Sequence, residues 1–225
     1  MLLGKMLSIK REKQCLLFDF DGVISDTESI YSDFWGKMGR EYLGIDDLDI
    51  KVKGCTLEKI LSENFADMPM EVSEICRRLD GLEETMTYEY IPGVVGFVME
   101  ARKRGLKLAI VTSSNMPKMR SVFSKRPEIK EMFDEVLTSE DFEKSKPDPD
   151  CYLKAMDRFG IDAEHSVVFE DSINGLKSAR KSGARVIGLT TTNPAEVVAR
   201  YASLVIPDFT YRESIFHFIE YYDPF

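Results

Sequence analysis

The sequence has 225 residues, which is more than one domain of about 150 residues and less than two. Its 44% hydrophobic content is typical of a folded protein and excludes a disordered or low-complexity chain. Because 30 basic and 39 acidic residues give a net charge of −9, neither nucleic acid nor an anionic membrane is an expected partner. The 4 cysteines lie far apart without a CxxC pair, which predicts buried free thiols rather than a zinc site or a dense disulfide framework.

No apolar run approaches the roughly 20 residues that a membrane-spanning helix needs. Residues 1–14 carry several basic side chains and no long apolar stretch, so they do not resemble a secretory leader. We therefore expect a cytoplasmic protein, either a monomer or a weak homodimer.

The first predicted element is a strand over Cys15–Phe20, an apolar run that leads into Asp19, Asp21 and Gly22. In an extended chain, alternation places Asp19 and Asp21 on one side and Phe20 on the other, toward the core. Two carboxylates that share a small site repel each other, so the pair indicates a divalent cation, an approaching phosphate or a shared proton. An ordinary strand end followed by a turn is the structural alternative.

Residues 29–91 show helical spacing of apolar residues and no convincing strand, which predicts an all-helical insert. The polar segment Ser25–Glu28 precedes it, and Pro92 and Gly93 follow it. Ser25 and Glu28 also fit a capping box for the first helix of the insert. The predicted organisation is a core domain of residues 1–28 and 92–225, about the size of one ordinary domain, with a helical cap of residues 29–91.

After the insert, short apolar runs alternate with helix-length segments, which is typical of a parallel α/β sheet. Each predicted helix is followed by a glycine suited to a left-handed helix end. The predicted helices are Val94–Arg104, Asp150–Phe159 and Ile173–Ser182. The predicted strands are Lys107–Thr112, Glu135–Thr138, Ser166–Glu170 and Arg185–Leu189, with a possible sixth at Ser203–Ile206.

Three later segments place polar side chains where a predicted strand ends or on the loop beyond it. They are Thr112–Asn115, the proline-containing loop with Lys146, and the acid pair Glu170–Asp171. Helix capping or a solvated lysine would explain each one alone. Open α/β sheets, however, bind ligands at the carboxyl ends of their strands, so the combination predicts one shared site.

Asp171 together with Asp19 can complete an all-oxygen magnesium site at that edge of the sheet. Glu170 fits equally well as a metal ligand or as a structural partner. Thr112 and the backbone amides that follow it could bind an anion.

The order of these motifs resembles the haloacid dehalogenase superfamily, in the subgroup of small phosphatases and β-phosphoglucomutase-like enzymes with a helical cap. The family's DxDG motif matches Asp19–Gly22, its hydroxyl matches Thr112, its lysine matches Lys146, and its acidic fourth motif matches Glu170–Asp171. The resemblance implies a Rossmann-like parallel sheet of strand order 5-4-1-2-3. That order sets the first and fourth strands side by side and brings Asp19 next to Asp171.

The resemblance also implies roles for these residues. Asp19 attacks phosphorus and becomes an aspartyl phosphate, while Asp21 protonates the leaving alcohol and then activates water. The implied Mg²⁺ ligands are Asp19, Asp171 and the backbone carbonyl of Asp21, with Glu170 as a further acid at the metal. Lys146 and Thr112 would hold the phosphoryl oxygens.

The expected function is therefore a Mg²⁺-dependent phosphatase acting on a small phosphorylated metabolite, such as a sugar phosphate. A sugar phosphomutase is the alternative, but β-phosphoglucomutase-like caps carry a histidine and an arginine where this chain has Tyr31 and Leu57. A phosphoacceptor signalling module is more remote, because the acid pair follows the first strand and an insert interrupts the core. Further expected substrate contacts are Ser113, Asn115, Lys53 and Thr56.

Overall fold

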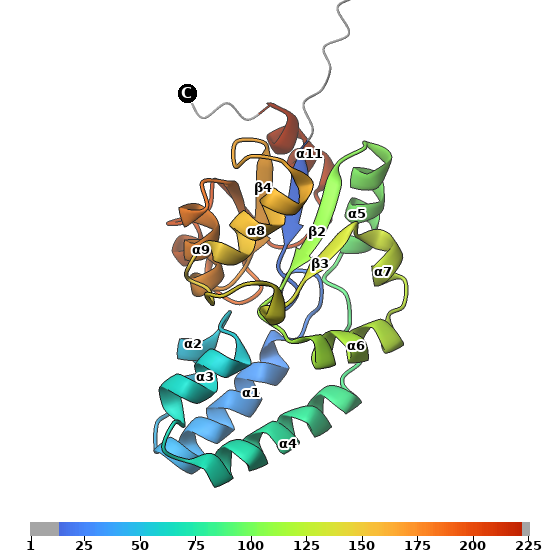
Figure 1. Cartoon of the computed structure of the whole chain (residues 1–225). Helices are drawn as coiled ribbons and strands as arrows, with labels where there is room; N and C mark the ends of the chain where they lie inside the picture. The colour runs from blue at the N-terminus through green and yellow to red at the C-terminus, as the bar shows by residue number, and fades with distance from the viewer. Residues whose placement is uncertain (1–13, 222–225) are drawn as a thin grey trace, which may run out of the picture.

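The computed structural model describes residues 14–221 (Figure 1). Residues 1–13, on which the expectation about a leader rests, and residues 222–225 lie outside the described residues. Within the described range, no helix is both long and apolar enough to cross a membrane. The four cysteines are free thiols, as expected, but only Cys15 and Cys151 are buried, whereas Cys55 and Cys76 are partly exposed.

Six parallel strands form one sheet in the order β3-β2-β1-β4-β5-β6. They are β1 (Cys15–Phe18), β2 (Lys107–Val111), β3 (Glu135–Leu137), β4 (Ser166–Glu170), β5 (Arg185–Leu189) and β6 (Leu204–Ile206). This order confirms the predicted Rossmann-like sheet, and the possible sixth strand adds beside β5. Phe18 at the end of β1 pairs with Ile110 of β2 and Phe169 of β4, so the carboxyl ends of the three strands lie together.

The core helices cover both faces of the sheet. They are α5 (Val94–Lys103), α6 (Met116–Lys125), α7 (Ile129–Met132), α8 (Asp150–Phe159), α9 (Ile173–Lys181), α10 (Ala195–Val198) and α11 (Arg212–Tyr221), with a 3₁₀ turn at Ser139–Asp141. Leu16 and Phe18 of β1 pack in a hydrophobic cluster with α5, α6, α7 and α11. Cys15 and Leu17 point to the opposite face and pack with α8, α9 and α10. Strand alternation thus builds a three-layer core.

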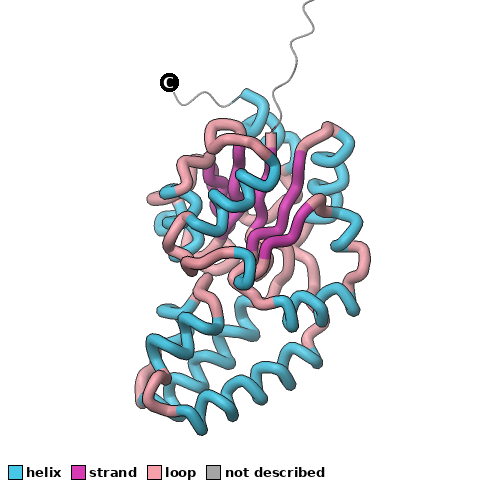
Figure 2. The backbone as a smooth tube through the Cα atoms, in the orientation of Figure 1, coloured by secondary structure: helices cyan, strands magenta, loops and turns pink. Residues whose placement is uncertain are grey.

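Between β1 and α5 the chain is helical, as predicted. The elements are α1 (Glu28–Met38), a π-helical turn at Gly39–Leu43, α2 (Leu48–Val52), α3 (Leu57–Asn64) and α4 (Pro69–Thr85). They enclose a hydrophobic cluster of their own, which includes Trp35, Val52, Ile60, Ile75 and Leu79. Figures 1 and 2 show this helical insert below the carboxyl ends of the strands, where the predicted site lies.

The predicted capping box at Ser25 and Glu28 is wrong. The structure begins α1 at Glu28 after Thr27, which makes no side-chain cap. The Ser25 hydroxyl donates instead to the carbonyl of Glu89 at 3.1 Å. The reason is tertiary: Ser25 forms an antiparallel bridge with Tyr90, because the chain leaves and re-enters the core side by side.

Candidate active site

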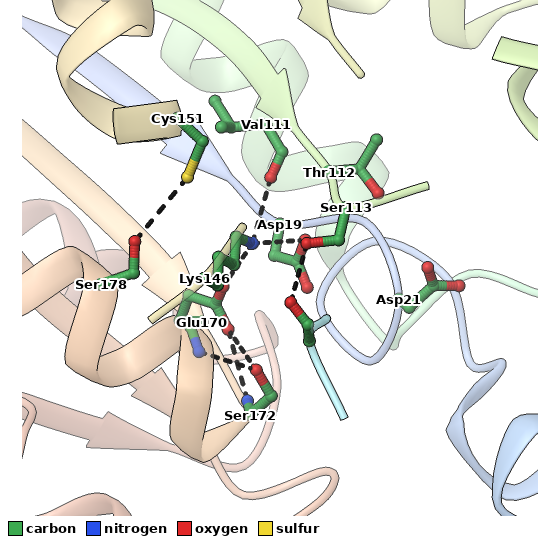
Figure 3. A network of polar contacts seen from close by, with 12 residues as sticks. Asp19, Asp21, Val111, Thr112, Ser113, Lys146, Cys151, Glu170, Ser172 and Ser178 are labelled. Carbon is green, nitrogen blue, oxygen red and sulfur yellow. Dashed lines mark hydrogen bonds and ion pairs between the residues drawn. The ribbon is translucent and has the colours of Figure 1, made fainter. Parts of the chain in front are cut away.

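The predicted catalytic residues gather at the carboxyl ends of β1, β2 and β4 (Figure 3). Asp19 directly follows β1, Thr112 directly follows β2, and Glu170 ends β4. Lys146 comes from the loop before α8 and is fully buried among them. Thr112 is also buried, and its hydroxyl oxygen accepts a hydrogen bond from the amide of Ser114 at 3.0 Å. Residues distant in sequence therefore meet at one edge of the sheet.

Lys146 connects the nucleophile expected from sequence to the acid pair. Its Nζ lies 2.9 Å from Asp19 Oδ1, 2.6 Å from Glu170 Oε1 and 3.3 Å from the carbonyl oxygen of Val111. Burial lowers the pKa of Lys146, but Asp19 and Glu170 raise it more, so the net pKa is above its usual value. The ammonium group stays protonated and partly offsets the negative charge of the site.

Both oxygens of Glu170 are occupied by donors from the protein. Oε1 accepts from Tyr152 at 2.7 Å as well as from Lys146, and Oε2 accepts from the amides of Asp171 and Ser172 at 3.0 and 3.3 Å. Oxygens of Glu170, Asp19 and Asp171 do lie within 4.8 Å of one another, as a metal site would require. The donors around Glu170 nevertheless favour the structural alternative, in which it positions Lys146.

Within residues 14–221, Asp171 has a carboxylate oxygen without a hydrogen-bond partner, as a cation ligand requires. Its Oδ1 is buried and has no hydrogen-bond partner among the described residues, whereas its Oδ2 accepts from Thr192. Burial and the nearby Glu28, Glu170 and Asp19 raise the pKa of Asp171 well above its usual value. An uncompensated buried carboxylate is unfavourable unless a cation or a proton neutralises it.

Asp19 shares this excess of negative charge. The net pKa of Asp19 is raised to about 7, because burial, Glu170 and Asp21 raise it by more than Lys146 lowers it. The ligands offered by Asp19 and Asp171 are carboxylate oxygens, the kind that Mg²⁺ prefers. The residues present therefore fit a magnesium site, with Asp19 and Asp171 as its side-chain ligands.

Gly22 allows the turn after β1 to pack directly against this site. Its φ is +72°, in the left-handed region that favours glycine. A Cβ at this position would lie 2.0 Å from Oδ2 of Asp171, which is too close for any side chain. The glycine of the DxDG motif is thus required by both its conformation and its surroundings.

Asp21 is held away from Asp19 by three donors. Its carboxylate accepts from Thr27 Oγ1 at 2.5 Å, Ser114 Oγ at 3.0 Å and Lys118 Nζ at 2.7 and 2.6 Å. Figure 3 shows the carboxylate turned outward from Asp19. The predicted strand was too long: β1 ends at Phe18, so strand alternation does not orient Asp21.

Sequence reasoning missed Lys118, which is buried at 5% exposure on α6. Its Nζ lies 4.2 Å from the ring centroid of Tyr31 on α1, which is cation–π distance. The Tyr31 hydroxyl in turn donates to Glu83 on α4 at 2.9 Å. The only indication in the sequence is that Lys118 follows the Thr112–Asn115 segment by less than one helical turn.

A cavity of about 100 Å³ lies between these strand ends and the helical insert. Asp19, Asp21 and Ser113 line its core side, and helices α1 to α4 line the other side. Lys53 and Asn115, two of the predicted substrate contacts, also line it. Asn115 has a structural role as well, because its Oδ1 caps α6 by accepting from the amide of Lys118 at 3.0 Å.

The loop from Lys53 to Thr56, within the insert, contacts the core through hydrogen bonds. The Ser113 hydroxyl donates to the carbonyl of Gly54 at 2.8 Å, and Asn174 Nδ2 donates to the carbonyl of Lys53 at 2.9 Å. The amide of Thr56 donates to Ser145 Oγ at 3.1 Å. The predicted substrate contact Thr56 is not among the residues that line the cavity; its hydroxyl caps α3.

Comparison with known sequences identifies the family. Residues 16–189 match the sequence model for haloacid dehalogenase-like hydrolases, a range that contains all four motifs. The chain belongs to this family. Within it, a Saccharomyces cerevisiae protein named as a probable pseudouridine-5′-phosphatase is 32% identical over 193 residues, covering 78% of this chain and 81% of that protein.

A second haloacid dehalogenase-like relative is the phosphorylated carbohydrates phosphatase of Thermotoga maritima. It is 27% identical over 190 residues, covering 78% of this chain and 85% of the relative. The crystal structure of a β-phosphoglucomutase from Clostridium difficile superimposes with a TM-score of 0.71 at 18% identity, covering 92% of this chain and 97% of that one. At that identity the superposition shows a shared fold.

Proposed function

We propose that this haloacid dehalogenase-like protein is a Mg²⁺-dependent phosphatase that hydrolyses a small phosphorylated metabolite through an aspartyl phosphate on Asp19. The observation that carries the proposal is the buried arrangement in which Lys146 contacts Asp19 while Asp171 Oδ1 has no partner among the described residues. Relatives named as phosphatases, one of them for phosphorylated carbohydrates, support the same class of reaction.

Asp19 supplies the nucleophile. A carboxylate oxygen of Asp19 attacks phosphorus, the bond from phosphorus to the ester oxygen breaks, and the leaving oxygen takes a proton from Asp21. Water then attacks phosphorus and gives its proton to Asp21, while the bond between phosphorus and the Asp19 oxygen breaks. This step releases inorganic phosphate and restores the Asp19 carboxylate. Lys146 opposes the effect of burial by lowering the pKa of Asp19 and, with Thr112, would contact the phosphoryl oxygens.

Mg²⁺ would be held by Asp19 and Asp171, with the backbone carbonyl of Asp21 as a further ligand. When bound, the ion supplies positive charge that offsets the negative charge of the phosphoryl group. Glu170 is assigned to the support of Lys146 because its oxygens already accept several hydrogen bonds.

We propose that residues 29–91 act as a cap over the site. The cavity lies between this helical segment and the strand ends, and the Lys53–Thr56 loop contacts the core through Ser113 and Asn174. A cap in this position restricts the access of water during phosphoryl transfer.

Hydrolysis is favoured over phosphomutase chemistry. Tyr31 and Leu57, at the positions where the mutase-like cap carries histidine and arginine, both line the cavity. The Tyr31 hydroxyl donates a hydrogen bond to Glu83 Oε1 at 2.9 Å. Neither residue provides the cationic group that would hold a phosphorylated product for a second transfer.

The test is a screen of phosphorylated metabolites for phosphate release, with and without Mg²⁺. Wild-type protein is expected to release phosphate only with Mg²⁺, and Asp19→Asn is expected to abolish that release. Asp33→Asn, on the exposed surface of α1, is the matched control and should retain activity. Activity that survives Asp19→Asn would contradict the proposal, and conversion of a hexose 1-phosphate to its isomer would favour the mutase.

A further inference from the structure

The helical insert contributes an apolar surface to its side of the cavity, beside several charged side chains. The apolar residues that line it are Trp35, Val52, Leu57, Ile60 and Leu79. All belong to, or pack against, the hydrophobic cluster of the insert. A substrate held under the cap therefore places part of its alcohol group against apolar surface, where a charged group would lose hydration without gaining a partner.

The cationic side chains of the cavity are already paired. Within the described part of the chain, Lys53 and Lys118 are the basic residues that line it. Lys118 Nζ lies 2.6 Å from Asp21 Oδ2, and Lys53 Nζ lies 3.3 Å from Glu28 Oε2. The four side chains are at most 21% exposed, so these pairs are largely shielded from solvent. A second anionic group on the substrate would have to break one of these pairs to gain a cation.

Two acids of the cavity have no such compensation. Asp49 on α2 and Glu83 on α4 line the cavity, and neither carboxylate forms an ion pair within residues 14–221. Glu83 accepts a hydrogen bond from Tyr31 at 2.9 Å. Asp49 makes no side-chain hydrogen bond in the same range. The cap side of the cavity therefore presents two carboxylates without an ion pair among the described residues, and Asp49 can accept a hydrogen bond from a ligand.

We infer that the preferred substrate is a phosphomonoester whose alcohol part has an apolar surface and is neutral or cationic, and that compounds with a second anionic group are selected against. This inference rests on the proposed phosphatase function. The phosphate would occupy the core side of the cavity near Asp19, and the alcohol part would lie against the apolar residues, with any amino or hydroxyl group near Asp49. Sugar bisphosphates and phosphorylated carboxylic acids would be poor substrates.

Three benzyl phosphates provide a matched test, because they share the reacting oxygen and the apolar ring. They carry a methyl, an aminomethyl or a carboxylate group at the para position. With Mg²⁺ present, kcat/KM for the carboxylate compound is expected to be at least about tenfold below that for the other two, as expected for a cavity that disfavours a second anion. Equal or faster hydrolysis of the carboxylate compound would overturn the inference.

The substitution Asp49→Asn tests whether Asp49 causes the preference against a second anionic group. Asp49→Asn removes one uncompensated charge and should raise kcat/KM for the carboxylate compound relative to the aminomethyl compound by at least about threefold. Asp46→Asn, at an exposed acid outside the cavity, is the control and should leave this ratio unchanged. An unchanged ratio in Asp49→Asn would overturn the role of Asp49 and, with it, the inference.

The failures of the two proposals are distinguishable. Mg²⁺-dependent release of phosphate from sugar bisphosphates in preference to all three benzyl phosphates would overturn the substrate inference and leave the phosphatase function in place. No phosphate release from any phosphomonoester would overturn the proposed function and the inference together.

Discussion

Nζ of Lys118 lies 2.7 and 2.6 Å from the two carboxylate oxygens of Asp21. The same ammonium group lies against the ring of Tyr31, which belongs to the helical insert and is hydrogen-bonded to Glu83. A core lysine thus links the proposed acid and base, Asp21, to two residues of the cap. Because Asp21 must reach the leaving oxygen, the position of the cap and the position of its carboxylate are coupled through Lys118.

Lys118→Met is expected to lower kcat by about tenfold or more, because Asp21 loses the ammonium group that orients its carboxylate for proton transfer. KM should change less than kcat, because Lys118 does not hold the phosphoryl group. Lys103→Met, at an exposed position on α5, controls for the loss of a lysine. Steady-state kinetics measure both constants, and an unchanged or higher kcat would show that the Lys118–Asp21 pair has no role in turnover.

Gly54→Ala should interfere with docking of the cap loop. Gly54 has a φ of +75°, and a Cβ there would lie 2.5 Å from Ser172 Oγ. Ser172 donates to Glu170, so displacing it disturbs the residue that positions Lys146. We expect kcat/KM to fall by at least about tenfold, because a small displacement of active-site groups slows the reaction strongly.

Gly44→Ala is the matched control for that variant. Gly44 also has a positive φ, +66°, but a Cβ there would meet nothing within 4 Å. The substitution should cost about 1 kcal/mol of stability, since alanine is strained in the left-handed region, and leave kcat/KM unchanged. Equal losses of activity in the two variants would attribute the Gly54 effect to backbone strain rather than to contact with Ser172.

Mg²⁺ affinity should distinguish the role of Asp171 as a metal ligand from the role of Glu170 as a structural partner. Asp171→Asn removes a side-chain ligand and is expected to weaken Mg²⁺ binding by at least about tenfold. Glu170→Gln should lower kcat while changing Mg²⁺ affinity by less than about threefold, because its oxygens accept from protein donors. Isothermal titration of Mg²⁺ into each variant measures this, and the opposite ranking would make Glu170 a metal ligand.

Mg²⁺ affinity should depend on pH. Burial raises the pKa of Asp19 to about 7 in the metal-free protein, and the ion binds the ionised carboxylate. Below that pKa a proton competes with the metal, and the raised pKa of Asp171 acts in the same direction, so affinity should fall as the pH decreases below about 7. Titrations of Mg²⁺ at several pH values test whether affinity falls with decreasing pH. Tighter binding at the lowest pH would contradict this prediction.

The sheet and the central part of the site could be predicted because they follow from local patterns. Apolar runs and glycine helix ends mark the elements, and the parallel arrangement brings the exits of β1 and β4 together. Asp19, Lys146 and Asp171 could therefore be assigned to one edge before their distances were known. In the structure, Lys146 Nζ lies 2.9 Å from Asp19 Oδ1 and 2.6 Å from Glu170 Oε1.

The cap contacts could not be predicted, because they depend on packing between segments distant in sequence. Ser25 fits a capping box locally, yet its hydroxyl is taken by Glu89 from the returning chain. In the sequence, Lys118 resembles an ordinary helix lysine. In the structure, it contacts Asp21 and Tyr31. Neither partner is near Lys118 in the sequence, so no local pattern identifies its role.

Asp19 is expected to become phosphorylated during turnover. Wild-type protein mixed with Mg²⁺ and a substrate found in the screen, and then quenched in acid during turnover, should carry the mass of one phosphoryl group on the peptide that contains Asp19. The Asp19→Asn protein treated in the same way should carry none. Phosphorylation at another residue, or turnover with no modified peptide even at the earliest quench times, would contradict the mechanism.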